Sequence, residues 1–220
     1  MAQHTVRTPG LTGSALIRLL ADWAAPDGHA SPRTSFADGL SQWTGWTQAI
    51  ALSAALEKPL AATGTPVRCE EEQGECERVR TALAQSITRD AQAAGRSPLE
   101  AGLGFSPYRQ CYLARQQAMD TQIAALRERV RAALAASTPE GARLAAVDAV
   151  MAQALAAQER RLLGSLPALL EKRFRAQCPA GEGDDPFRDD LQALLLAELE
   201  LRLQPVQGLL KALGHMTTTA

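Results

Sequence analysis

One uninterrupted segment, residues 106–136, limits most strongly what this chain can fold into. After Pro107 it contains no proline and no glycine, and its apolar residues recur at intervals of mainly three and four. This spacing places them on one face of an α-helix, and about 30 residues of helix extend about 45 Å. The apolar positions are Tyr112, Met119, Ile123, Leu126, Val130 and Leu134. A helix this long with a narrow apolar face predicts packing along other long helices, as in a coiled coil.

The segment that follows predicts a helical hairpin. The short stretch ASTPEGA contains Thr138, a favourable N-cap, and Pro139, which suits the first helical position. The next helix is expected to run to about Leu163, and so short a joint returns it antiparallel to its predecessor. Its predicted inner face consists of Leu144, Val147, Met151, Leu155 and Leu162.

The same periodicity predicts further helices on both sides of this hairpin. They are expected at about 14–25, 35–58 and 70–94 before it, and at about 168–178, after a break near Gly164 to Pro167, and from 186 onwards after it, with Pro205 kinking or ending the last one. Composition agrees, since the chain has 42 Ala, the best helix former, against nine Phe, Trp and Tyr. We expect an all-α, elongated antiparallel bundle of about six to seven helices, in which the hairpin is formed by the fourth and fifth.

The glycine- and proline-containing stretch AAGRSPLEAGLGFSP predicts the main division of the chain. We expect an N-terminal helical part at 1–96, a linker at 97–105 and a C-terminal helical bundle at 106–220. The alternative is that both parts form one domain.

Charge and hydropathy disfavour nucleic acid and membrane insertion. The net charge is −1, and the basic residues near Arg129 alternate with acidic ones rather than forming a continuous stripe. The N-terminal apolar segment is interrupted by Arg18 and Asp22 and has the spacing of an amphipathic helix, not of a signal peptide. We therefore expect a cytoplasmic protein without direct membrane insertion.

Sequence motifs for catalysis and metal binding are missing. The four cysteines form no C-x-x-C pair, and His4, His29 and His215 lie in terminal or loop-like stretches. No Glu-x-x-His, G-x-S-x-G or glycine-rich phosphate loop occurs. We expect free thiols, no metal, no cofactor and no catalytic residues, hence no enzyme.

Two tryptophans in LSQWTGWTQAIAL raise the question of an aromatic binding platform. Trp43 and Trp46 fall on one face of the predicted 35–58 helix. A platform for nucleic acid would need flanking basic residues, and none lies between Thr34 and Lys58. We expect both tryptophans to be anchors in a core or an interface, near its edge because each indole N–H needs a partner.

The best candidate for a small-molecule site is the start of the long helix. Tyr108 and Tyr112, at i and i+4, are interleaved with Arg109 and Arg115, which could together stack on and pair with an anionic ligand. The alternative is an ordinary helix flank, with tyrosine rings at the edge of the core and arginine heads in solvent.

The last predicted helix carries leucine on more than one face. Leu195, Leu199 and Leu203 belong to this set, and we expect them to contribute to self-association or to docking on a partner helix. In that case Glu198, Glu200 and Arg202 lie at the rim of the interface. The alternative is a central helix surrounded by its neighbours.

Several stretches together resemble a known family. They are LSQWTGWTQAIALSAAL, SPYRQCYLARQQAM, RLAAVDAVMAQALAAQERRLL followed by PALLEKRF, and LLLAELELRLQPVQGLLKAL. The chain resembles, over roughly Leu11 to Leu213, an uncharacterised bacterial family catalogued as domain of unknown function 3348. The resemblance implies no known activity and carries over no catalytic residues. It implies a cytosolic accessory to a membrane-associated complex, since such families are encoded beside envelope proteins.

These observations favour a non-enzymatic cytosolic adaptor or assembly protein that acts through helix–helix interactions with protein partners, with a homodimer as one form. The alternative from another class is a helical protein that binds a small anionic ligand at Tyr108, Arg109, Tyr112 and Arg115. An atypical nucleic-acid binder is the third and least supported hypothesis.

Overall fold

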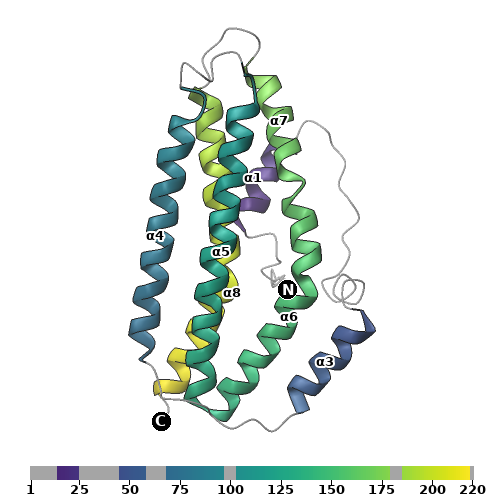
Figure 1. The fold of residues 1–220 in the computed structure, drawn as a ribbon, viewed down its shortest axis with the longest axis vertical. Coiled ribbons are helices and arrows are strands. Elements are labelled where there is room, and N and C mark those ends of the chain that lie inside the picture. The colour runs from purple at the N-terminus through teal and green to yellow at the C-terminus, as the bar shows by residue number, and fades with distance from the viewer. Residues whose placement is uncertain (1–13, 25–44, 58–67, 97–102, 179–184, 219–220) are drawn as a thin grey trace, which may run out of the picture.

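The computed structural model describes residues 14–24, 45–57, 68–96, 103–178 and 185–218, and every regular element within these ranges is an α-helix (Figure 1). The helices are α1 (Ala15–Ala24), α3 (Trp46–Glu57), α4 (Cys69–Ala93), α5 (Ser106–Ser137), α6 (Pro139–Leu163), α7 (Leu166–Gln177) and α8 (Asp185–Thr218). They pack on one another as an elongated bundle. The predicted all-α fold is therefore confirmed.

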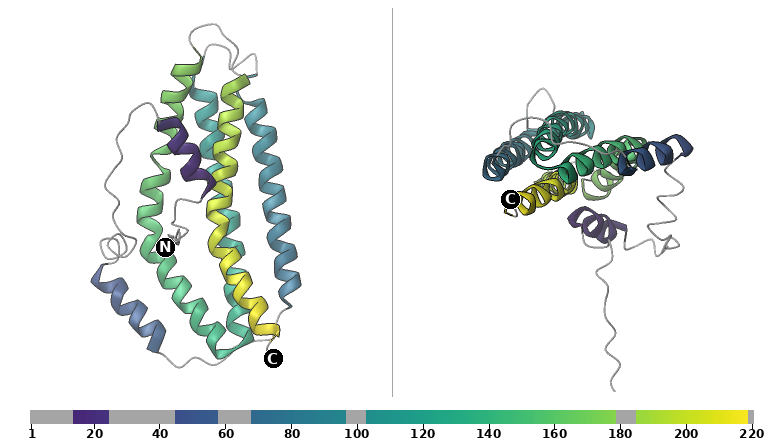
Figure 2. Two further views of the ribbon diagram at one scale, coloured as in Figure 1. Left: turned by 180° about the vertical axis from the view of Figure 1, so that it is seen from behind. Right: turned by 90° about the horizontal axis from the view of Figure 1, so that it is seen from below.

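The bundle is built around α5 and α8, which lie side by side and run in the same direction (Figures 1 and 2). Their contacts progress together, from Tyr112 with Glu198 to Ser137 with Met216. Helix α4 flanks this pair on one side, antiparallel to both, and α6 with α7 flanks it on the other. Helices α5 and α8 are thus the two central helices of a flattened arrangement, with α4 on one side and α6 and α7 on the other.

The hairpin formed by α5 and α6 follows the prediction. The side chain of Thr138 accepts a hydrogen bond of 3.0 Å from the backbone N–H of Gly141, which makes Thr138 the N-cap of α6. Antiparallel pairing is seen in the hydrogen bonds from Arg127 to Asp148 and from Gln116 to the carbonyl of Leu163. Because the connection between them is so short, α6 packs antiparallel to α5.

The break between α6 and α7 has an identifiable cause. A Cβ at Gly164 would lie only 2.7 Å from the carbonyl oxygen of Arg160, and Pro167 has no N–H to continue the helical ladder. Instead, the Ser165 hydroxyl donates to the carbonyl of Leu162 at 2.6 Å. Both α6 and α7 make few contacts with α8.

Helix α8 supplies the centre of the core. Eleven of its apolar side chains are buried: Phe187, Leu191, Leu194, Leu195, Ala197, Leu199, Leu203, Val206, Leu209, Leu210 and Leu213. Pro205 lies inside the helix, which continues to Thr218, so the prediction that the helix could end near Gln204 is wrong. Pro205 cannot donate a backbone hydrogen bond, and packing on both sides of the helix holds this segment in place.

The predicted division at 97–105 does not separate two bundles. Helix α4 lies before this stretch, yet it packs on α5 and α8, which lie after it. The contact is polar as well as apolar, since Arg188 in α8 donates to the carbonyl of Ala94 at 2.9 Å and Gln92 donates to Gln192 at 3.2 Å. Cys76, Leu83 and Ile87 of α4 are buried in the same core.

Candidate functional site

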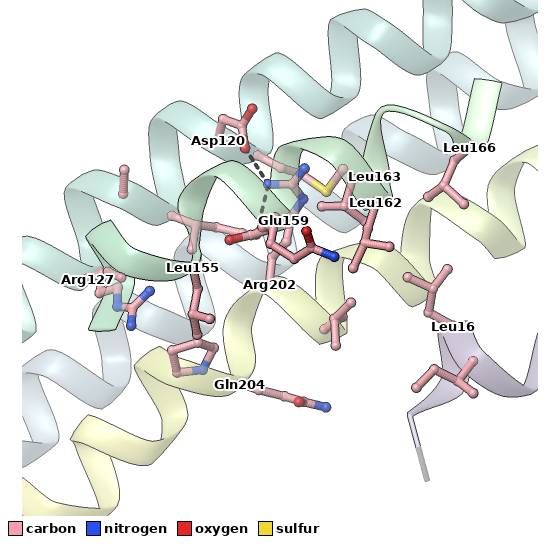
Figure 3. Close-up of a pocket in the computed structure, with 18 of the residues that line it drawn as sticks. Leu16, Asp120, Arg127, Leu155, Glu159, Leu162, Leu163, Leu166, Arg202 and Gln204 are labelled. Atoms are coloured by element: carbon pink, nitrogen blue, oxygen red, sulfur yellow. Dashed lines mark hydrogen bonds and ion pairs between the residues drawn. The ribbon is translucent and has the colours of Figure 1, made fainter. Parts of the chain in front are cut away.

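A cleft of about 790 Å³ opens between α6 and α8, with α5 as its floor (Figure 3). Helices α1 and α7 line one end of it, through Leu16, Leu166 and Leu169. The lining is mainly apolar, with leucine as its commonest residue, and includes charged groups from α5, α6 and α8.

The cleft explains why the predicted inner face of α6 is incompletely buried. Leu144, Val147, Met151 and Leu155 are only half-buried, and Leu162 is 55% exposed. The prediction that this whole face enters the core is therefore wrong for Leu162. The reason is that α8 packs mainly on α5 and α4 and makes few contacts with α6. Leu155 and Leu162 instead line the cleft.

Three carboxylates surround one guanidinium group in the wall of the cleft, and Figure 3 shows two of them, Asp120 and Glu159, beside Arg202. Arg202 in α8 pairs with Glu198 one turn earlier, at 2.7 Å, with Asp120 of α5 and with Glu159 of α6. The side chain of Arg202 is only 9% exposed and that of Glu198 is fully buried. Burial would lower the pKa of Arg202, but the charge of Glu198 and the other carboxylates raises it, so the guanidinium stays charged.

The inner carboxylate of this group has two further partners. The hydroxyl of Tyr112 donates to Glu198 at 2.5 Å, and the amide of Gln116 donates to its other oxygen at 3.0 Å. Burial, followed by the charge of Glu198, raises the pKa of Tyr112, so its hydroxyl remains a proton donor. A buried carboxylate with this many donors is a fixed structural charge.

The structure does not bring Tyr108, Arg109, Tyr112 and Arg115 together as an anion site. Both tyrosines are buried in the core, whereas Arg109 is exposed and Arg115 lies 3.3 Å from Asp90 of α4. The helix face that carries the tyrosines is covered by α7 and α8. Tyr108 contacts the rings of Phe174 and Phe187 there, with centroid distances of 5.4 and 5.1 Å. The hypothesis of a stacking platform at these residues is therefore wrong.

Leu195, Leu199 and Leu203 are not available as an interaction surface, because all three are fully buried within the chain. The alternative of a central helix surrounded by its neighbours is the one observed. The expected position of Glu198 at a rim is wrong for the same reason. A glutamate and an arginine at i and i+4 among leucines was the available signal for a buried ion pair.

The two tryptophans have different outcomes. Trp43 lies outside the described residues. Trp46 is the first residue of α3 and is 82% exposed, so it is not an anchor in the core. Its helix lies along the outer side of α6, away from α5 and α8, and none of its residues is buried (Figure 2). An interface with another protein stays a prediction for Trp46.

A second charged group joins α5 to α6 beside the cleft. Asp148 accepts from Arg127 at 2.5 and 2.9 Å and from Arg131 at 2.7 Å. Burial alone would raise the pKa of Asp148, but the hydrogen bonds and charges of the two arginines outweigh it and hold this pKa below its usual value. The carboxylate is therefore charged throughout the neutral range.

This lowered pKa makes a prediction for stability against pH. A carboxyl group whose pKa is lower in the folded chain stabilises the fold above its unfolded pKa, about 3.9, and loses this contribution as the pH falls through the folded pKa. We expect the difference in unfolding free energy between the wild type and Asp148→Asn to be constant above about pH 5 and to shrink below about pH 4. Urea denaturation across this range measures it, and a difference that does not vary with pH contradicts the assignment.

The structure places all four cysteines within the described part of the chain. No group of three or more His, Cys, Asp or Glu within it is arranged to hold a metal ion. The four cysteines, all within that part, form no disulfide. Burial raises the pKa of Cys69 and, with the same leading cause, that of Cys76, which keeps both thiols protonated.

The fold and the cleft define an all-α, four-helix-type bundle with an apolar groove. Residues 1–215 match the model of a family described as a protein of unknown function, DUF3348, and the chain belongs to this family. The resemblance found in the sequence is thereby confirmed. No curated protein and no solved structure matches the chain. Of the helices described, none combines the length and the apolar character that crossing a membrane requires.

Proposed function

We propose that this protein is a non-enzymatic cytoplasmic adaptor or assembly protein that holds an α-helix of a partner protein in the cleft between α6 and α8. The observation that carries the proposal is the exposed apolar lining of this cleft. Ile17, Leu162 and Leu169 are large apolar side chains that are each about half exposed, and all three line it. Contiguous exposed apolar surface of this kind is typical of protein interaction sites.

The dimensions of the cleft suit a helix. Its floor extends along α5 from Met119 to Arg131, which at about 1.5 Å per residue is about 18 Å. Two helices, α6 and α8, form its long walls and leave a groove between them. An amphipathic helix of about three turns can place its apolar face against the leucines of such a groove.

The polar groups of the cleft support binding rather than reaction. Arg202 is bound to carboxylates on three sides, and Arg127 and Arg131 are both bound to Asp148. Groups held in such pairs have fixed charges and orientations, which suits recognition of a charged or polar edge on a partner. The hypothesis of a small anionic ligand, by contrast, has lost the residues on which it depended.

A photo-crosslinking residue at position 162, introduced into the native cell, tests the proposal. Leu162 lies in the cleft, and Leu113, which is also exposed but lies outside the cleft, supplies the control position. We expect a helical segment of a defined protein to be crosslinked from position 162 and not from position 113. The segment, made as a peptide, must then bind the purified chain.

The matched substitution is Leu162→Arg, with Leu113→Arg as its control. We expect Leu162→Arg to weaken binding of that peptide at least about tenfold, because it places a charge in an apolar contact, and Leu113→Arg to leave binding within about twofold. Fluorescence anisotropy measures both. Equal binding by the two variants, or crosslinks that do not depend on position, contradicts the cleft as the binding site.

A further inference from the structure

We infer that the helix bound in this cleft is basic: beside its apolar face it carries a lysine or arginine that lies between Asp120 and Glu159. This inference rests on the proposed function and specifies the chemistry of the partner. It comes from the charges that line the cleft, from their unequal exposure and from the helices that carry them.

The charged groups around Arg202 carry more negative than positive charge. Arg202 contributes one positive charge, and Glu198, Asp120 and Glu159 each contribute a negative one. Glu198 is fully buried, and its two oxygens are already occupied by Arg202, Tyr112 and Gln116. The two outer carboxylates share what remains of a single guanidinium group, so this part of the cleft has an excess of negative charge.

The two outer carboxylates are far more exposed than the arginine with which they pair. The side chains of Asp120 and Glu159 are 53% and 51% exposed, whereas the guanidinium group between them belongs to a side chain that is almost completely buried. A molecule that enters the cleft therefore meets the carboxylates before it meets the arginine. An anion would be repelled by both, and a cation is attracted by both.

The two outer carboxylates lie on different sides of the cleft. Asp120 projects from α5 and Glu159 from α6, so the carboxylates come from the floor and from one wall of the cleft (Figure 3). Leu162 lies one turn from Glu159 on the same helix. A helix that packs its apolar residues on Leu162 and Leu155 would thus carry a neighbouring side chain past Glu159. One long, cationic side chain in that place can reach both carboxylates.

The other basic residues of the cleft do not reverse this preference. Arg127 and Arg131 lie about two and three turns further along α5 from Asp120. Both are largely buried, and both donate to Asp148 of α6. They can pair with an acidic residue at the opposite end of a bound helix, but they do not neutralise the carboxylates near Arg202.

Two model peptides of about 16 residues test the inference, since shorter ones hold too little helix in water. They share one leucine- and alanine-based apolar face and differ only in the flanking residues, which are lysine in one and glutamate in the other. Fluorescence anisotropy with the purified full chain at about 50 mM salt gives both affinities. We expect the lysine peptide to bind about 5- to 10-fold more tightly, the range for two half-exposed ion pairs.

The charge variant is Asp120→Asn with Glu159→Gln, in which we expect the preference to fall below about twofold. Its control is Glu77→Gln with Glu171→Gln, which removes the same charge from exposed positions outside the cleft and should retain the preference. Circular dichroism checks that both double variants keep the helical fold. A preference that survives in the cleft variant overturns the inference.

The remaining outcomes separate this inference from the proposed function. Equal binding of both peptides, lost on Leu162→Arg, refutes the basic partner and leaves the helix-binding cleft in place. Binding of neither peptide contradicts the proposed function and the inference together. A dimer detected by light scattering, and dissociated by Leu162→Arg, assigns the cleft to a second copy of this chain and overturns a basic partner helix.

Discussion

Replacing Arg202 with methionine is expected to lower the free energy of unfolding by about 3–5 kcal/mol. The substitution leaves the buried carboxylate of Glu198 without its cation, and only Tyr112 and Gln116 then donate to it. A buried charge without compensation is among the most destabilising changes known for a folded chain. Urea denaturation followed by circular dichroism at neutral pH measures the loss.

The double variant Arg202→Met with Glu198→Leu is the matched control. It removes both charges and fills their place with apolar side chains of similar volume. We expect it to recover most of the stability lost in Arg202→Met, because the cost arises from the unpaired charge and not from the missing contacts. A double variant that is less stable than Arg202→Met alone contradicts the claim that the ion pair is the source of the effect.

The second large effect is expected from Phe187→Ala, also about 3–5 kcal/mol of destabilisation. Phe187 is fully buried at the end of the bundle where α5, α7 and α8 meet. Its ring contacts those of Phe105, Tyr108 and Phe174 at centroid distances between 5.1 and 6.2 Å. Removal of the ring leaves a cavity that three neighbouring rings cannot close without leaving their own contacts. Thermal and urea denaturation give the change.

Leu113→Ala supplies the comparison, because this leucine on α5 is partly exposed and belongs to no buried cluster. We expect its effect to stay within about 0.5 kcal/mol. If Phe187→Ala also changes stability by no more than this amount, the aromatic cluster does not contribute to the core as described.

Periodicity was sufficient to predict most helices and most of their buried faces. The six apolar residues predicted for one face of α5, from Tyr112 to Leu134, are all buried. The α5–α6 joint, with Thr138 as N-cap, followed from residue types alone. These features depend on interactions between residues a few positions apart, which a single sequence contains directly.

The pairing of helices was not predictable in this way. Nothing in the local sequence indicates that α8 packs on α5 rather than on α6, and this choice decides that Leu162 faces a cleft instead of a core. Amphipathic spacing shows which face is apolar but not which neighbour covers it. For the same reason it could not show that α3 lies at the edge of the bundle with Trp46 exposed.

The candidate site was missed because its residues are distant in sequence and unremarkable one by one. Asp120, Glu159 and Arg202 lie on three helices, and each resembles an ordinary charge on an amphipathic surface. The tyrosines of α5, by contrast, stand out in the sequence and are core residues. Residue type drew attention to Tyr108 and Tyr112, whereas the geometry of the cleft depends on long-range packing.

The central place of α8 has a consequence for how the chain acquires its structure. The contacts that close the core join α8 to segments made much earlier, as in the pairs Cys69 with Leu210 and Arg80 with Glu200. Helices α4, α5 and α6 are therefore synthesised before α8, which completes the core around α4 and α5. The α5–α6 hairpin can form early and α4 can begin to pack on α5, but the contacts of α4 with α8 form last, and such distant contacts form more slowly than local ones. Until then the apolar faces of α4 and α5 that α8 will cover stay exposed, and chaperones can bind them.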